Sequence, residues 1–197
     1  MKEDKQIWDD FRKGEDYALS HIYFQYTPFL FCYGRKFSQD EEMIKDVIQD
    51  LFFYLISTRE SLGTTDNIRF YLMASFRRRL ADAIKQKAPL SYSDNEVLKA
   101  EIIYSAEHEL IDKEELSHRE QTVKKALAKL SPKQREILFY KFSCNFDYDQ
   151  ICEIMQIQYD SARKQVSRAL KGLKEILVSS DMFVLFLSFF QKDKVMF

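Results

Sequence analysis

Apolar residues recur at spacings of three and four along most of this 197-residue chain, the period of helices that are buried on one side. The pattern predicts two groups of helices. They are expected at residues 7–14, 15–38, 40–58 and 67–87, and then at 114–130, 131–143, 148–155 and 159–177. Pro28 lacks a backbone donor and predicts a kink inside the second helix.

Several of these helices begin at residues that favour helix starts. Asp40 is expected to cap the third helix. Ser131 stands before Pro132, the usual order of a cap and a first helical residue. Asp147 is followed three positions later by Gln150, the spacing of a capping box. The segment between the last two helices, around 155–160, is long enough only for a tight turn.

The two groups of helices are separated by a segment of different character. Pro89 ends the first group, and residues 88–112 are acidic and poorly periodic, which is typical of a linker. We therefore expect an all-α protein of two small helical domains. The domains are predicted at 1–87 and 113–178, with the linker at 88–112 and an apolar tail at 179–197.

The net charge of −1 conceals a strong local asymmetry. Residues 69–87 carry 6 cations and 1 anion, and residues 119–178 carry 12 cations and 7 anions. Residues 1–68 carry 8 cations and 13 anions, and residues 88–118 carry 2 cations and 8 anions. Each group of helices therefore contains one basic block that could face an anionic partner.

Other classes of site find little support. The 3 cysteines and 3 histidines show no metal-ligand spacing, and with 4 glycines there is no Gly-rich phosphate loop. No acid pair or Cys–His pair suggests an enzyme, a cofactor or a small-molecule substrate. The N-terminus lacks an apolar signal core and no run is long enough to span a membrane, so we expect a soluble, cytoplasmic protein with free thiols.

The helix predicted at 159–177 has two distinct faces. Its apolar residues are Ala162, Val166, Ala169, Leu170, Leu173, Ile176 and Leu177. Its other face carries Ser161, Arg163, Lys164, Ser167, Arg168, Lys171 and Lys174. A short capped helix, a tight turn and this basic helix together predict a helix-turn-helix, whose second helix can enter the DNA major groove. The alternative is a basic face that is only solvated.

Several segments of the chain, taken in their order along the sequence, resemble one known protein family. "LSPKQREILFYKF" and "DYDQICEIMQIQYDSARKQVSRALKGL" resemble region 4 of extracytoplasmic-function (ECF) RNA polymerase sigma factors. "GEDYALSHIYFQYTPFLF", "IKDVIQDLFFYLI" and "IRFYLMASFRRRLADAIKQK" resemble segments of their region 2. The resemblance covers about 15–87 and 114–177 and implies a bacterial sigma factor with two domains.

The resemblance also implies roles for individual residues. Asp46, Gln49 and Asp50 fall at the polar positions of the segment that binds the polymerase clamp. Loop 61–67 falls where a flipped base of the −10 strand is captured. The residues implied at the −10 element are Asp66, Asn67, Arg77, Arg78, Lys85 and Lys87; those implied at the −35 element are Arg135, Tyr148, Ser161, Arg163, Lys164, Ser167, Arg168 and Lys171. Arg78 stands where the family usually has Asn.

The implied function is promoter-specific transcription initiation with core RNA polymerase and promoter DNA as partners, without catalysis by this chain. One alternative is a helix-turn-helix regulator that never binds polymerase; another is a helical protein-interaction module. The apolar stretch 182–190 either packs on the chain's own domains or docks a partner such as an anti-sigma factor.

Overall fold

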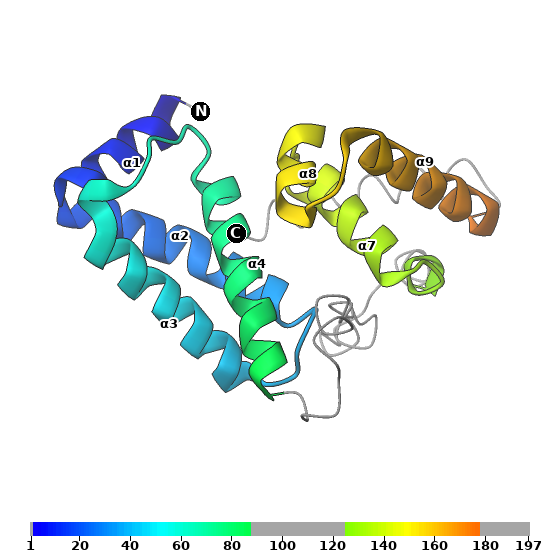
Figure 1. Ribbon diagram of the computed structural model, residues 1–197, viewed down its shortest axis with the longest axis horizontal. Helices are drawn as coiled ribbons and strands as arrows, with labels where there is room; N and C mark the ends of the chain where they lie inside the picture. The colour runs from blue at the N-terminus through cyan, green and yellow to red at the C-terminus, as the bar shows by residue number, and fades with distance from the viewer. Residues whose placement is uncertain (1, 88–124, 178–197) are drawn as a thin grey trace. The chain divides into compact units, whose positions relative to one another are not determined.

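The computed structural model describes residues 2–87 and 125–177 (Figure 1). The first helices are α1 (Lys2–Lys13), α2 (Asp16–Gly34), α3 (Glu41–Thr58), the 3-10 turn η1 (Arg59–Ser61) and α4 (Ile68–Lys87). The later ones are α7 (Pro132–Leu138), the π-helical turn η3 (Phe139–Ser143), α8 (Tyr148–Met155) and α9 (Tyr159–Ile176). All regular structure in these described ranges is helical, which confirms the predicted all-α class.

The chain divides into two compact units, Met1–Ala100 and Glu101–Phe197. The predicted linker at 88–112 and tail at 179–197, including 182–190, lie outside the described residues. The domain limits at 87/88, 112/113 and 178/179 therefore stay predictions.

The three predicted caps are confirmed. The Asp40 carboxylate accepts from the backbone N–H of Met43 at 2.9 Å at the start of α3. Ser131 and Asp147 each form a full capping box, in which the cap side chain and the glutamine three residues later satisfy each other's backbone N–H groups. These reciprocal bonds supply partners for donors that a helix start would otherwise leave unsatisfied.

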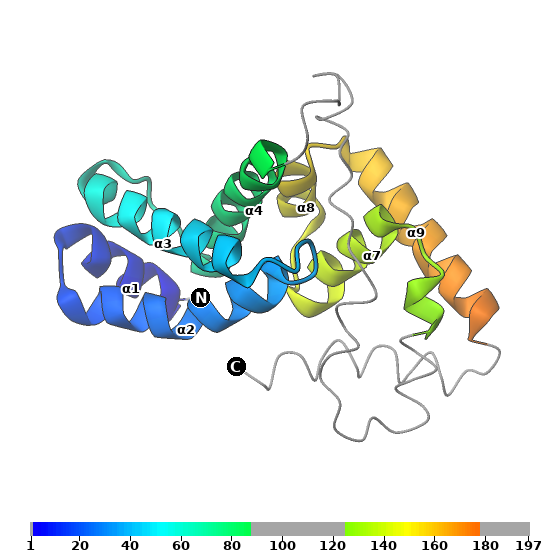
Figure 2. The ribbon, with the colours of Figure 1, turned by 90° about the horizontal axis from the view of Figure 1, so that it is seen from below.

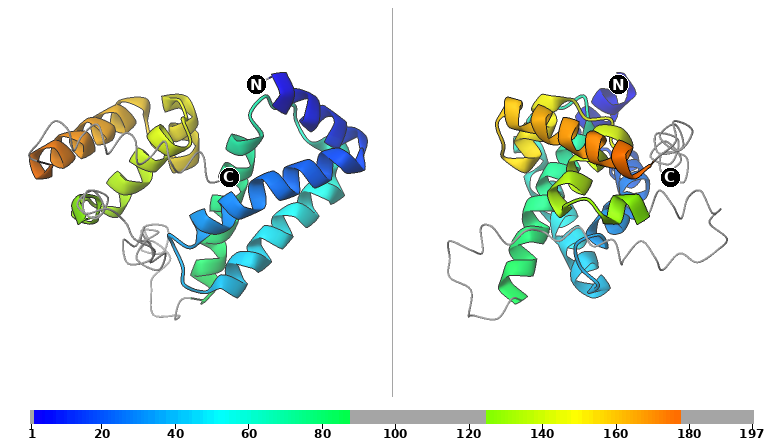
Figure 3. Two further views of the ribbon diagram at one scale, coloured as in Figure 1. Left: turned by 180° about the vertical axis from the view of Figure 1, so that it is seen from behind. Right: turned by 90° about the vertical axis from the view of Figure 1, so that its right-hand side faces the viewer.

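In the first unit, α2 and α3 lie side by side and α4 packs against both (Figures 1 and 3). Large apolar side chains close the space between the three helices. The most buried of them include Ile22, Leu30, Tyr33, Ile44, Leu51, Leu55, Leu72 and Phe76. Gly34 lets α2 approach its neighbours, because a Cβ there would lie 2.7 Å from Cγ2 of Ile44 and 3.3 Å from Cζ of Phe76.

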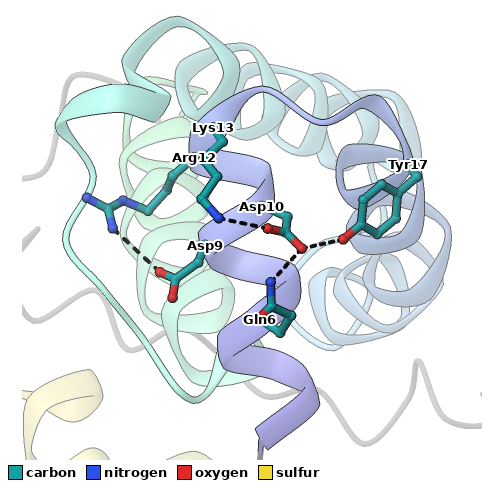
Figure 4. Close-up of polar contacts among 6 residues, drawn as sticks. All are labelled: Gln6, Asp9, Asp10, Arg12, Lys13 and Tyr17. Atoms are coloured by element: carbon teal, nitrogen blue, oxygen red, sulfur yellow. Dashed lines mark hydrogen bonds and ion pairs between the residues drawn. The ribbon is translucent and has the colours of Figure 1, made fainter.

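A polar cluster fixes the corner between α1 and α2 (Figure 4). The Tyr17 hydroxyl donates to the Asp10 carboxylate, which also accepts from Gln6 at 2.8 Å and from Lys13 at 3.2 Å. Chiefly because of the Tyr17 hydrogen bond, and then that of Gln6, the pKa of Asp10 falls from 3.8 to about 2. The cluster thus ties the last turn of α1 to the first turn of α2 through one ionised carboxylate.

In the second unit, α7 and α8 both pack against α9 (Figure 2). The core is formed by Ile137, Leu138, Tyr140, Phe146, Ile151, Ala162, Val166, Ala169 and Leu173. Two polar groups are buried together, because the Tyr140 hydroxyl donates to Glu136 at 2.8 Å. A buried carboxyl group needs such a donor, and the pair joins the end of α7 to η3.

Some limits and faces differ from the sequence prediction. α1 begins at Lys2 rather than at residue 7, and α2 continues through Pro28 but ends at Gly34 rather than at residue 38. Tyr23 and Ile56 follow the three-four spacing of the apolar residues of α2 and α3, which predicts that they are buried, but they are 42% and 41% exposed. Both residues lie at the edges of their stripes, where helical spacing alone does not decide whether a neighbour covers them.

Candidate nucleic-acid interface

The helix-turn-helix is built as the sequence pattern indicates. α8 ends at Met155, α9 begins at Tyr159, and Gln156 takes the left-handed conformation with φ 53° and ψ 49°. The N–H groups of Gln156 and Ile157 both point to the carbonyl oxygen of Cys152. This arrangement closes the end of α8, with glutamine in a conformation that glycine adopts at lower cost.

The second helix of the motif presents one buried and one exposed face. Ala162, Val166, Ala169 and Leu173 are at most 4% exposed. The six predicted −35 residues that lie on α9 are all exposed: Ser161, Arg163, Lys164, Ser167, Arg168 and Lys171. From Ser161 to Arg168 the helix rises about 10 Å, which suits roughly three base pairs. The exposed face therefore carries four cations and two hydroxyls between Ser161 and Lys171, and this part of α9 could enter a major groove.

The other two predicted −35 residues have local roles. Arg135 is only 8% exposed, and its guanidinium donates to the carbonyl oxygens of Leu130 at 2.7 Å and Ala128 at 3.2 Å. It holds the chain before α7 in place rather than projecting from the surface. Tyr148 is half-buried at the start of α8, with the Lys141 ammonium 4.7 Å from its ring centre and the Tyr159 ring at 5.6 Å.

The basic residues of α4 differ in their exposure. Arg78 is exposed, whereas Arg77 and Lys85 are half-buried. Lys87 is exposed but paired, because its ammonium lies 2.6 Å from the Asp40 carboxylate. The Arg79 guanidinium lies 4.5 Å from the centre of the Tyr54 ring, consistent with an arginine that rests on an apolar surface. Arg78 and Lys87 are thus the exposed cations of the predicted −10 set, and Lys87 is held by Asp40.

The loop before α4 is short and ordered by its own side chains. The Asn67 side-chain oxygen accepts from the N–H of Phe70 at 2.9 Å and so caps α4. The Thr65 hydroxyl accepts from the N–H of Asn67 at 3.1 Å. Asp66 is exposed between them. Of the two loop residues predicted to meet DNA, Asp66 is free to turn outward and Asn67 uses one of its side-chain groups in the cap.

The outer face of α3 brings together the three predicted polymerase contacts. Asp46, Gln49 and Asp50 are all exposed at helical spacings of three and one, opposite the buried stripe. Phe53 follows at the next turn of the same face and is 72% exposed. Phe53 was not among the contacts predicted from the sequence, although its spacing from Asp46, Gln49 and Asp50 could have placed it on their face.

Two further classes of site are absent within residues 2–87 and 125–177. No group of His, Cys, Asp and Glu there could hold a metal ion. In the same ranges, none of the helices combines the length and the apolar character needed to cross a membrane.

Comparison with known proteins bears on both units. Residues 120–173 match the family described as "Sigma-70, region 4", and this match covers α7, α8 and most of α9. No curated protein is similar enough to the chain to count as a match. Among solved structures, the chain is similar to "Structure of CnrH in complex with the cytosolic domain of CnrY", with a TM-score of 0.56 and 14% sequence identity, over 90% of this chain and 98% of that one. At this identity the likeness shows a shared fold.

Proposed function

We propose that the chain is an ECF-type sigma factor, on the basis that residues 120–173 match the family described as "Sigma-70, region 4". In this role it binds core RNA polymerase in the cytoplasm and directs initiation at specific promoters. The observation that carries the proposal is the exposed face of α9, which bears Arg163, Lys164 and Arg168. α9 follows α8, a helix with a capping box at its start, after a tight turn.

The α9 face supports recognition of a duplex −35 element. The first two turns of a recognition helix reach the base edges, and Arg or Lys can donate to guanine, with about 1–3 kcal/mol of discrimination for each good contact. Ser161, Ser167 and Lys171 extend the same face toward bases and phosphates. Tyr148, at the start of α8, lies where a phosphate contact would orient the motif. Arg135 holds the segment before α7 through its bonds to Ala128 and Leu130.

The first unit supports capture of an unpaired −10 strand. Arg77, Arg78 and Lys85 lie on α4, and the capped loop that ends at Asn67 precedes them. Unpairing and unstacking a base costs a few kcal/mol, which favourable contacts to the extruded base and its backbone offset. Lys87 contributes once phosphate competes with Asp40 for its ammonium group. The proposed activity is therefore binding and strand separation without nucleotide hydrolysis.

The exposed face of α3 is proposed as the surface that docks on the polymerase. It offers two carboxylates, one amide and the Phe53 ring, so the partner surface would be cationic around an apolar recess. The fold is shared with CnrH, which was solved together with the cytosolic domain of CnrY. By analogy we propose that a protein partner of the anti-sigma kind also regulates this chain.

Run-off transcription with purified core polymerase and a promoter library tests the proposal. We expect defined start sites that require the chain. Arg168→Ala should weaken or redirect promoter choice, whereas Lys174→Ala removes the same charge from the last turn of α9 and should leave choice unchanged. If Asp46→Ala and Gln49→Ala leave polymerase binding intact, or if no start site depends on the chain, the proposal fails. Sequence-specific DNA binding without polymerase binding would favour the helix-turn-helix regulator.

A further inference from the structure

Two residues of α1 hold the loop before α4 at both of its ends. The indole N–H of Trp8 donates to the carbonyl oxygen of Gly63 at 2.8 Å, across 55 positions of sequence. The backbone N–H of Ile68 donates to the Asp4 carboxylate at 3.2 Å, across 64 positions. Trp8 is completely buried, with its ring centre 4.7 Å from that of Tyr71 on α4.

The contact at Gly63 also orients the peptide that follows it. No peptide bond in the described residues is cis. In a trans peptide, a carbonyl and the next N–H point in opposite directions. Since the Gly63 carbonyl points to the Trp8 indole, the N–H of Thr64 points away from α1, and Thr64 itself is exposed. A hydrogen-bond donor of the loop, on an exposed residue, is thereby aimed away from α1.

We propose that α1 is a positioning element, in which Trp8 and Asp4 preorganise loop residues 63–67 to receive an unpaired base. This inference rests on the function proposed above for the loop, and it extends that function to a helix outside the region 2 resemblance. A loop already fixed at both ends loses less conformational freedom when a nucleotide binds. Trp8 does not touch the nucleotide; it acts through the Gly63 peptide.

The first experiment measures loop order in the free full-length chain by hydrogen exchange. Trp8→Phe keeps a ring in the core but removes the donor to Gly63, and Asp4→Ala removes the second contact from a partly exposed position. Amides of residues 63–68 should exchange roughly two- to tenfold faster in both variants. Phe11→Leu is the control, because Phe11 is buried in the same α1 core beside Trp8, but its side chain has no hydrogen-bond donor to offer the loop. Equal exchange in all three variants and the native chain would overturn the inference.

The second experiment measures function in the complex with core polymerase. The probe is a single-stranded DNA oligonucleotide with the non-template sequence of a start region found by run-off transcription. Its affinity should fall roughly fivefold to tenfold in Trp8→Phe and in Asp4→Ala, with duplex −35 affinity and polymerase affinity unchanged. Unchanged affinity for the probe would refute positioning while leaving the sigma-factor proposal standing.

The outcomes separate the two proposals. If the native complex does not bind the probe at all, the function proposed for the loop fails, and the inference about α1 fails with it. If Trp8→Phe does not fold, Asp4→Ala decides alone. Trp8 is the single tryptophan of the chain, so the wavelength of tryptophan fluorescence shows whether Trp8 stays buried in Asp4→Ala and Phe11→Leu.

Discussion

Replacing Phe53 by alanine is the sharpest test of the docking face proposed on α3. Phe53 is 72% exposed, on the same side of the helix as Asp46 and Gln49. Its ring packs little against the chain's own core, so its removal should hardly change the folded state. A large effect on polymerase binding would therefore come from the interface itself.

The magnitude follows from the exposed area. A phenylalanine side chain buries roughly 150–250 Å² when it is fully covered. With 72% of Phe53 still exposed, docking could remove about 140 Å² from water. At about 25 cal/mol per Å² this corresponds to a ceiling of about 3.5 kcal/mol. Ordering costs at the interface reduce the gain, and we expect about 2 kcal/mol, or a roughly 30-fold weaker Kd.

The assay is a titration of labelled full-length chain with purified core polymerase. Phe24→Ala is the matched control, because Phe24 is 76% exposed but lies on α2 rather than on α3. We expect Phe53→Ala to lose about 30-fold in affinity and Phe24→Ala less than threefold. A loss below threefold for Phe53→Ala would contradict the reasoning. Equal losses for both variants would show that docking is not confined to this face.

Three further predictions concern the scaffold. Gln156→Gly should relieve the cost of a left-handed side-chain-bearing residue and raise the melting temperature of the second unit by about 3 to 6 °C in calorimetry. Gly34→Ala places a Cβ against the α3 isoleucine beside it and should cost about 1–3 kcal/mol in chemical unfolding, whereas Gly63→Ala meets open space and should cost less than about 0.5 kcal/mol. Tyr17→Phe should raise the pKa of Asp10 from about 2 toward 3.8, as read by NMR titration. A carboxyl group whose pKa is lower in the folded state stabilises the fold at every pH above its unfolded pKa. The stability that Asp10 contributes should therefore be lost as the pH falls from about 4 to about 2 in the native chain, and it should be smaller in Tyr17→Phe.

The sequence predicted the elements whose causes are local. Asp40, Ser131 and Asp147 cap their helices as expected, because each capping bond joins residues three apart. The limits of α8, from Tyr148 to Met155, agree with the predicted 148–155 for the same reason. The six exposed positions on α9 followed from helical spacing, because the apolar and charged residues separate cleanly onto opposite sides.

Features that depend on distant contacts could not be predicted. Arg135 looks like a surface cation in sequence, and only the fold shows that its guanidinium meets the carbonyls of Ala128 and Leu130. The contact of Trp8 with Gly63 spans 55 positions, and nothing in the local pattern of either residue marks it. The exposure of Tyr23 likewise depends on how α2 meets α3, which periodicity does not encode.

The pair between Asp40 and Lys87 affects how salt titrations of DNA binding should be interpreted. A lysine that is already neutralised by a carboxylate exchanges one anion for another when it meets a phosphate. It then displaces fewer bound cations from the nucleic acid than an unpaired lysine would. If Lys87 contacts a phosphate as proposed, the slope of log affinity against log salt should consequently undercount the phosphate contacts, and Asp40→Asn should steepen it.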